Sequence, residues 1–112
     1  MTDDRLPTDV WVMAQVRQCS IDGIPAYVLH SGEPKGGAVL LKINRLEKGC
    51  RVLSQMRDMD GKLTWYATHD EEFVSEADAD GYVARAVGRD PDLWVVEIES
   101  RDGWYPFGGK EF

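Results

Sequence analysis

The sequence lacks the features that mark most membrane, secreted and nucleic-acid-binding proteins. No apolar run in its 112 residues approaches the roughly 20 residues that a membrane-spanning helix needs. The chain opens on acidic residues, with no basic segment ahead of an apolar core, so we expect no signal peptide. Basic residues are also few, since 13 Lys and Arg face 20 Asp and Glu and give a formal net charge of −7. This balance argues against a general binder of nucleic acid or of anionic membranes.

Cysteine is scarce and nucleotide-binding motifs are missing. Cys19 and Cys50 form no CxxC pair, so we expect two buried thiols in a reducing cytoplasm rather than a disulfide. There is no GxGxxG, and the glycine turn from Gly32 to Gly37 leads into a strand rather than the helix that a P-loop needs. We therefore expect no cofactor, no metal, a cytoplasmic location and one domain over residues 1–112. Residues 1–6 would form a loose N-terminus and residues 103–112 an aromatic and glycine-rich tail.

The most strand-like segment runs from Leu93 to Glu99. β-Branched and aromatic residues dominate it, and it follows Pro91, which cannot continue a helix. We predict an inner strand of an antiparallel or mixed sheet, with Glu97 on the face away from the core. The residues predicted to face the core are Trp94, Val96 and Ile98.

Four further strands are predicted over residues 25–30, 38–45, 50–57 and 62–67, with turn signals such as Asp60-Gly61 between them. Three successive hairpins would make an antiparallel meander, and the last strand would join it at an edge or between earlier strands. The predicted fold class is α+β. It has about five strands and two helices packed on one face, in the order helix-strand-strand-strand-strand-helix-strand.

The first helix is predicted from Asp9 to Cys19, with Thr8 accepting hydrogen bonds from its first turn. Its expected buried face consists of Val12, Met13, Val16 and Cys19. Because residues 10–16 also have strand propensity, a strand is the alternative there. The second helix is predicted to begin at the Ser75 cap. Its expected buried residues are Ala79, Tyr82, Val83, Ala86 and Val87.

Charge is distributed unevenly along the chain. From Lys35 to Lys62 there are seven basic residues against three acidic ones. Strand alternation predicts that Lys42 and Asn44 face solvent on a basic sheet face suited to an anion or an acidic partner. An ordinary solvated sheet face explains the same pattern. The candidate binding residues are Lys42, Arg51, Arg57, Lys62, Tyr66 and, from the aromatic tail, Trp104.

A small enzyme or metal-binding protein is the alternative hypothesis. His30 or His69, together with Asp90 and Asp92, would supply its acid–base or ligating groups. No nucleophile or metal-ligand motif accompanies these residues, and turns explain the aspartates equally well. The sequence therefore favours a non-enzymatic binding or accessory module. Its expected partner is a protein, an anionic ligand or a second copy of the chain.

Two segments carry a family resemblance. Residues 32–46 and 89–99 resemble parts of a small alphaproteobacterial family of unknown function, number 1491 in the series of such domains. Trp11-Val12 and the helix start at Ser75-Glu76-Ala77-Asp78 are similar to it too, so the resemblance covers most of the chain. It implies a stand-alone bacterial protein, and it carries no activity, ligand or site residue.

Overall fold

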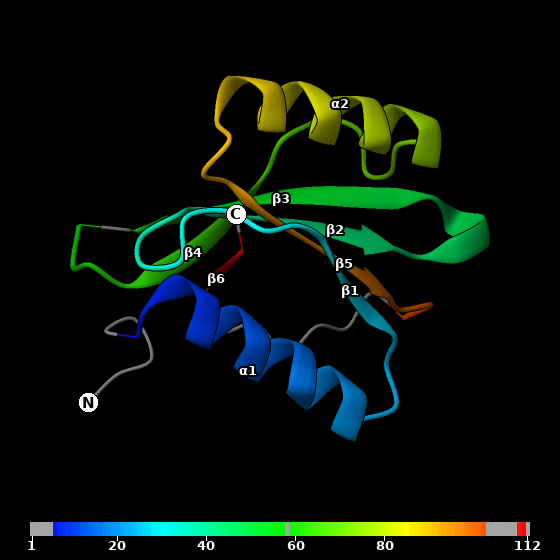
Figure 1. The fold of residues 1–112 in the computed structure, drawn as a ribbon. Helices are drawn as coiled ribbons and strands as arrows, with labels where there is room; N and C mark the ends of the chain where they lie inside the picture. Colours follow the sequence, from blue (N-terminus) through cyan, green and yellow to red (C-terminus); the bar gives the residue numbers. More distant parts are fainter. Residues whose placement is uncertain (1–5, 58, 103–109, 112) are drawn as a thin grey trace.

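The computed structural model describes residues 6–57, 59–102 and 110–111, and it has three layers: a helix, a mixed β-sheet and a second helix (Figure 1). In chain order the elements are α1 (Thr8–Ile21), β1 (Ala26–His30), β2 (Val39–Asn44), the short 3-10 helix η2 (Leu46–Lys48), β3 (Cys50–Arg57), β4 (Leu63–Ala67), α2 (Glu76–Arg89), β5 (Trp94–Glu99) and β6 (Lys110–Glu111). The α+β class and the predicted order of helices and strands are confirmed, and residues 10–16 are helical.

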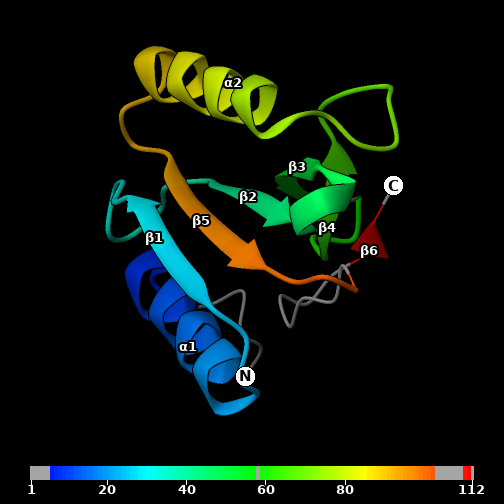
Figure 2. The same cartoon turned by 90° about the vertical axis from the view of Figure 1, so that its right-hand side faces the viewer.

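The strands lie in the order β1-β5-β2-β3-β4-β6. Of the two positions that the sequence left open for the last strand, β5 takes the inner one, because it pairs antiparallel with β1 and parallel with β2. The predicted hairpins β2–β3 and β3–β4 are present. The predicted third hairpin, between β1 and β2, is wrong because β5 lies between these two strands (Figure 2). A parallel neighbour requires a long crossover, which here consists of β3, β4 and α2.

α1 and α2 cover opposite faces of the sheet, so the prediction that both pack on one face is wrong (Figure 1). Alternate residues of the inner strands serve two separate cores. The core on the α1 side includes Trp11, Val12, Leu41, Leu53, Trp65 and Val96. The core on the α2 side includes Leu40, Val52, Ala79, Ala86 and Val95. Because both faces are covered, β2 is buried along its whole length.

α1 differs from the sequence prediction at its start and in its buried face. Pro7 occupies the N-cap position with no side-chain hydrogen bond, and the Thr8 hydroxyl instead donates to the Gly37 carbonyl at 3.1 Å. Met13 was predicted to be buried and is 53% exposed. The ring of Trp11 is buried in its place and stacks on Trp65, with 6.5 Å between the ring centroids. A tryptophan buries more apolar area than a methionine, so it sets the rotation of the helix.

α2 follows its prediction closely. The Ser75 side chain accepts the Asp78 backbone N–H at 3.1 Å, and Glu76 and Asp78 place acidic groups in the first turn. The predicted apolar side packs on the sheet, with Ala79 and Ala86 buried. Neither of the two helices in the described part of the chain is long and apolar enough to span a membrane.

Candidate functional site

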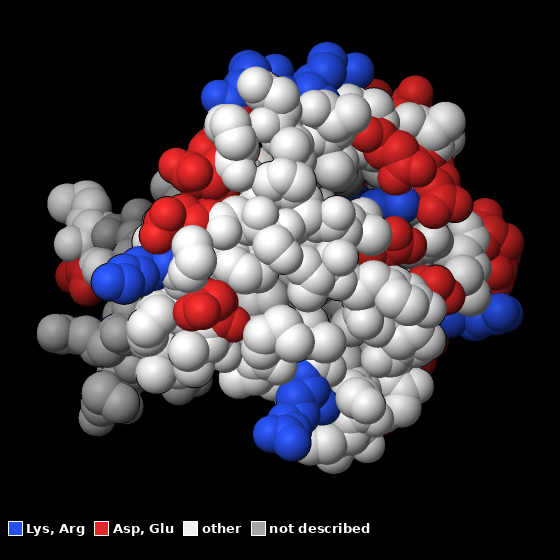
Figure 3. All heavy atoms as spheres, in the orientation of Figure 1, with Lys and Arg blue, Asp and Glu red and all other residues white. Residues whose placement is uncertain are grey.

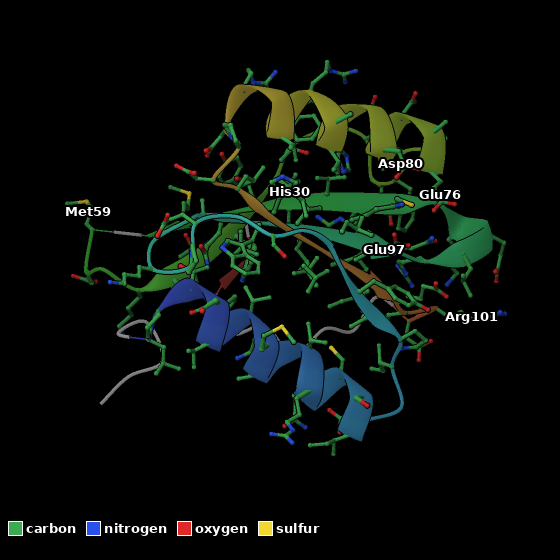
Figure 4. The ribbon with its side chains drawn as sticks, viewed as in Figure 1. His30, Met59, Glu76, Asp80, Glu97 and Arg101 are labelled. Carbon is green, nitrogen blue, oxygen red and sulfur yellow. The ribbon has the colours of Figure 1, made fainter. Side chains whose placement is uncertain are left out.

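A buried lysine surrounded by carboxylates lies where α2 crosses the sheet. Figure 4 labels the three acidic residues, Glu76, Asp80 and Glu97. Lys42, on β2, is 1% exposed. Its Nζ atom lies 2.7 Å from Asp80 Oδ1, 2.9 Å from Glu76 Oε2 and 3.3 Å from Glu97 Oε1. Glu76 and Asp80 are four residues apart on α2 and so point to the same side of the helix. The cluster therefore joins β2, β5 and α2.

The register of the parallel strands positions this cluster. Lys42 on β2 is aligned with Glu97 on β5, and both side chains lie on the α2 side of the sheet. Asn44 Nδ2 donates to Glu76 Oε2 and to Glu97 Oε2 at 3.2 Å each, and Asn44 Oδ1 accepts the Leu46 N–H at 2.8 Å. In the described ranges no buried side-chain nitrogen or oxygen lacks a hydrogen-bond partner. The sheet thus buries polar groups at its centre and satisfies them there.

The electrostatics of the cluster keep Lys42 charged. Burial by itself would lower the pKa of Lys42, but the hydrogen bonds to Asp80 and Glu76 and the charge of Glu97 outweigh it and raise the pKa above its ordinary range. The three N–H groups of an ammonium match the three carboxylates. The amine is therefore neither a nucleophile nor a general base near neutral pH. The chemistry of the cluster is that of an ion-pair network that fixes α2 on the sheet.

The predicted basic sheet face does not form as one surface. The prediction that Lys42 and Asn44 face solvent is wrong, because Lys42 is 1% and Asn44 8% exposed beneath α2. Cross-strand register separates two other predicted binding residues. Arg51 is aligned with Ile43 on the α1 side of the sheet, whereas Tyr66 is aligned with Ser54 on the α2 side.

The structure describes the other three predicted binding residues only in part. Lys62 immediately precedes β4, in the loop that joins it to β3. Arg57 ends β3, but its side chain lies outside the described part of the chain, as does Trp104 with the rest of the aromatic segment 104–107.

The residues of the enzyme hypothesis are divided between two places. His30 Nδ1 lies 2.7 Å from the Leu93 carbonyl, and Asp90 Oδ1 accepts the Asp92 N–H at 3.1 Å, so these three side chains lie near the turn that leads into β5. His69 instead contacts β3, two strands away from β5.

The main chain uses both ring nitrogens of His69. Nε2 accepts the Val52 N–H at 3.1 Å, and Nδ1 donates to the Glu71 carbonyl at 2.8 Å. The Val52 amide requires an acceptor at Nε2, which assigns the ring proton to Nδ1. Among the residues that the structure describes, no group of three His, Cys, Asp or Glu side chains is arranged to hold a metal ion.

Both cysteines are buried free thiols, as predicted. Cys19 belongs to the core on the α1 side and Cys50 to the core on the α2 side, so the sheet separates them. Burial raises the pKa of each thiol. Both therefore remain protonated and poorly reactive near neutral pH.

α1 is also apolar on the side that faces away from the sheet. Val10, Met13 and Ile21 are 49%, 53% and 71% exposed. Together with Ala14 and Arg17 they line an open groove along the helix. Spacings of three and four residues place these positions on one helix face. Figure 3 shows the lower rim of the molecule, where α1 lies, as largely uncharged surface with a basic group on it. We call this surface, lined by Val10, Met13, Ala14, Arg17 and Ile21, the outer face of α1.

Comparison with known proteins decides the family. The model of a family described as protein of unknown function (DUF1491) matches residues 6–108. The chain belongs to the DUF1491 family. The resemblance found in the sequence is thereby confirmed.

Solved structures of similar proteins share the fold. A crystal structure of a DUF1491 family protein from Caulobacter crescentus CB15 is 39% identical, with a TM-score of 0.85 over 96% of this chain and 99% of that chain. An NMR structure of a DUF1491 family protein from the same organism is 38% identical, with a TM-score of 0.82 over 96% and 97% of the two chains. The solution structure of Atu0922 from A. tumefaciens is 25% identical, with a TM-score of 0.68 over 86% of each chain. A search among curated proteins finds no match.

The description of the DUF1491 family names no activity. The relatives establish kinship and fold, and evidence on the function of this DUF1491 chain has to come from its own side chains. Two features stand out: the internal ion-pair network at Lys42 and the outer face of α1.

Proposed function

We propose that this protein is a small non-enzymatic binding module of the bacterial cytoplasm, and that the outer face of α1 is its interaction surface. One observation carries the proposal: α1 is apolar on two opposite sides. Trp11, Val12 and Cys19 are buried against the sheet, whereas Val10 and Met13 are about half exposed on the other side. A helix on the surface of a soluble domain ordinarily carries polar residues outward. An apolar outer stripe is typical of a helix that a partner covers.

The polar residues that flank the apolar stripe of α1 are consistent with a protein–protein interface. Asp9 and Gln18 line the same groove and lie on either side of the apolar residues. Gln18 Nε2 donates to Asp22 Oδ2 at 3.0 Å, which orders this polar side chain at the groove's end. An apolar centre with a polar rim is the usual arrangement of a protein–protein interface.

The titratable side chains already form hydrogen bonds or ion pairs within the protein, which favours a binding role over a catalytic one. A catalytic acid, base or nucleophile must keep an atom available to its substrate. All three N–H groups of Lys42 are matched by carboxylates, and the main chain uses both ring nitrogens of His69. The alternative, an enzyme using His30 with Asp90 and Asp92, has weaker support because His30 Nδ1 is bonded to the main chain and Asp90 caps its own turn.

The residues that the sequence predicted for a basic sheet face are poorer candidates for the interaction surface than the outer face of α1. Arg51 and Tyr66 lie on opposite faces of the sheet, so a single flat partner cannot contact both. An anionic ligand on the sheet could therefore contact Arg51 or Tyr66, but not both.

Photocrosslinking in the native host tests the proposal. A photoreactive amino acid is placed at Met13, which is 53% exposed on the outer face of α1. The matched control is Met59, a methionine that is fully exposed (103%) in the β3–β4 loop and labelled in Figure 4. We expect a discrete protein adduct from position 13 and none from position 59. A folded position-13 variant that gives no adduct would contradict the proposed binding role.

A further inference from the structure

We infer that the outer face of α1 binds a second copy of this chain, with the two α1 helices packed antiparallel about a two-fold axis at Met13. The inference rests on the proposed binding role of that face and names its occupant. It follows from the order of charged and apolar residues along the helix.

The charges on this face are self-complementary. Asp9 lies four residues before Met13 and Arg17 four residues after it, and all three line the groove. At a rise of about 1.5 Å per residue, each charge lies about 6 Å along the helix from Met13. A two-fold axis at Met13 brings Asp9 of each copy level with the partner's Arg17, so the same ion pair forms twice.

The orientation of the pair follows from the same charges. A parallel arrangement in register would place Asp9 against the partner's Asp9 and Arg17 against the partner's Arg17. Like charges directly opposed across an interface are unfavourable, whereas the antiparallel arrangement opposes unlike charges at both ends. The groove lining carries one aspartate and one arginine. Self-pairing there therefore avoids the repulsion that the net charge of −7 imposes elsewhere on the surface.

Three apolar residues of the outer face, Val10, Met13 and Ala14, lie between the two ion pairs. Met13 lies at the axis, where an unbranched side chain adapts to its symmetry mate. Ala14 beside it is small enough to allow close approach of the two helices. Val10 lies three residues before Met13 on the same helix face and adds apolar area beside it.

The expected dimer is weak. α1 has 14 residues, and one pair of such helices buries less than the roughly 1,600 Å² of a standard protein interface. We therefore expect reversible dimerisation with a dissociation constant in the range of ~10 µM to ~1 mM.

Variants that reverse the charge at position 9 or 17 test this arrangement, with self-association measured by sedimentation equilibrium. Asp9→Arg places an arginine against the partner's Arg17, and Arg17→Glu places a glutamate against the partner's Asp9. We expect each variant alone to self-associate about tenfold more weakly than the wild type, because like charges then face each other at both ends. An equimolar mixture of the two variants should recover wild-type affinity, because both ion pairs are attractive in the mixed dimer.

Controls separate folding from association. Because Asp9 lies in the first turn of α1, the melting temperature of each variant is measured by circular dichroism, and Asp9→Asn with Arg17→Gln repeats the test with neutral side chains. Lys48→Glu, on η2, controls for net charge and should leave association unchanged. A wild-type protein that stays monomeric up to about 1 mM, or a mixture no stronger than its components, would overturn the inference.

The failure of this inference is distinguishable from failure of the proposed function. A position-13 crosslink of twice the monomer mass supports self-pairing. A position-13 crosslink to a different protein keeps the binding role and overturns the second copy as occupant. The absence of any adduct overturns the proposed binding role, whereas self-pairing is decided separately by sedimentation equilibrium.

Discussion

The ammonium nitrogen of Lys42 lies 2.7 Å from the carboxylate of Asp80, and this contact ties the middle of the sheet to the second turn of α2. Apolar packing alone specifies the position of a helix on a sheet loosely, because it is not directional. The hydrogen bonds from Lys42 to Asp80, Glu76 and Glu97 are directional and are made in one register only. The cluster therefore fixes where α2 sits, which is a structural role.

Removing the charge of Lys42 should destabilise the fold. Lys42→Met keeps the volume of the side chain but leaves Glu97, whose side chain is 11% exposed, without its cation. We expect a loss of about 2–3 kcal/mol in the free energy of unfolding, less than for a fully buried pair, because water screens the more exposed Glu76 and Asp80. Urea denaturation measures it. Lys35→Met, an exposed lysine with the same change, should stay within about 0.5 kcal/mol of the wild type.

From neutral pH upward, the contribution of Lys42 should change only in strong base. Its pKa is raised above the ordinary 10.5, with the hydrogen bonds to Asp80 and Glu76 outweighing the opposing effect of burial. A raised pKa gives stability that is complete below the unfolded-state value of about 10.4 and is lost as pH rises toward the folded-state value. The stability difference between wild type and Lys42→Met should therefore be constant from pH 7 to pH 9 and shrink above about pH 10.4. A difference that vanishes already at pH 9 would show that Lys42 is not held in its charged form.

The glycine turn before β2 offers a matched pair of substitutions. A Cβ atom at Gly37 would collide with the backbone carbonyl of Asp92 and approach the Trp94 ring, whereas a Cβ at Gly36 meets nothing within 4 Å. Gly37→Ala should cost about 3 kcal/mol or more, because a backbone atom cannot move aside as a flexible side chain can. Gly36→Ala should be neutral or slightly stabilising. Thermal melts of the two variants check this, and equal melting temperatures would contradict the close packing of this turn on β5.

The cap of α2 should contribute a modest and local stability. Ser75→Ala removes the acceptor for the Asp78 N–H and should cost about 1 kcal/mol, while Ser75→Asp should retain most of it. Amide hydrogen exchange at Asp78 should accelerate in the alanine variant. As a control, Ser20→Ala near the end of α1 should leave that exchange rate unchanged. Unaltered exchange in Ser75→Ala would mean that the cap does not hold the first turn.

Local patterns in the sequence predict most elements of this fold. The β-branched run of β5 after Pro91, the alternation in β2 and β3, and the Ser75 cap each depend on residues close together in the chain. The pairing of β1 with β5 could not be predicted in this way. The connection from β1 to β2 is glycine-rich and resembles a hairpin turn, and nothing local shows that a strand more than fifty residues later lies between them.

The cluster of Lys42 was missed for the same reason. A lysine in an alternating strand ordinarily faces solvent, and its partners Glu76 and Glu97 are 34 and 55 residues away. The signal was a charged residue in the middle of each of two apolar strands, Lys42 in one and Glu97 in the other, with opposite signs. Such a pair is stable when the strands are neighbours and both faces of the sheet are covered.

The sequence prediction assigned part of the buried face of α1 incorrectly, because it misjudged the rotation of the helix about its own axis. Trp11, Val12 and Met13 are consecutive and apolar, and three consecutive residues of a helix cannot all share one face. The sequence prediction buried Met13, whereas the fold buries Trp11 and turns Met13 outward. The apolar excess of α1 was therefore visible in the sequence, but its direction depends on the contact of Trp11 with Trp65 across the core.

Oxidation of methionines tests the central claim, that a partner covers the outer face of α1, most directly. Peroxide converts exposed methionines to sulfoxides at rates that follow their accessibility. In the dilute purified protein both Met13 and Met59 should oxidise, since they are 53% and 103% exposed. In intact host cells we predict that oxidation of Met13 becomes slower relative to Met59, measured by mass spectrometry of the two peptides. An unchanged ratio of the two rates between dilute solution and cells would contradict the account.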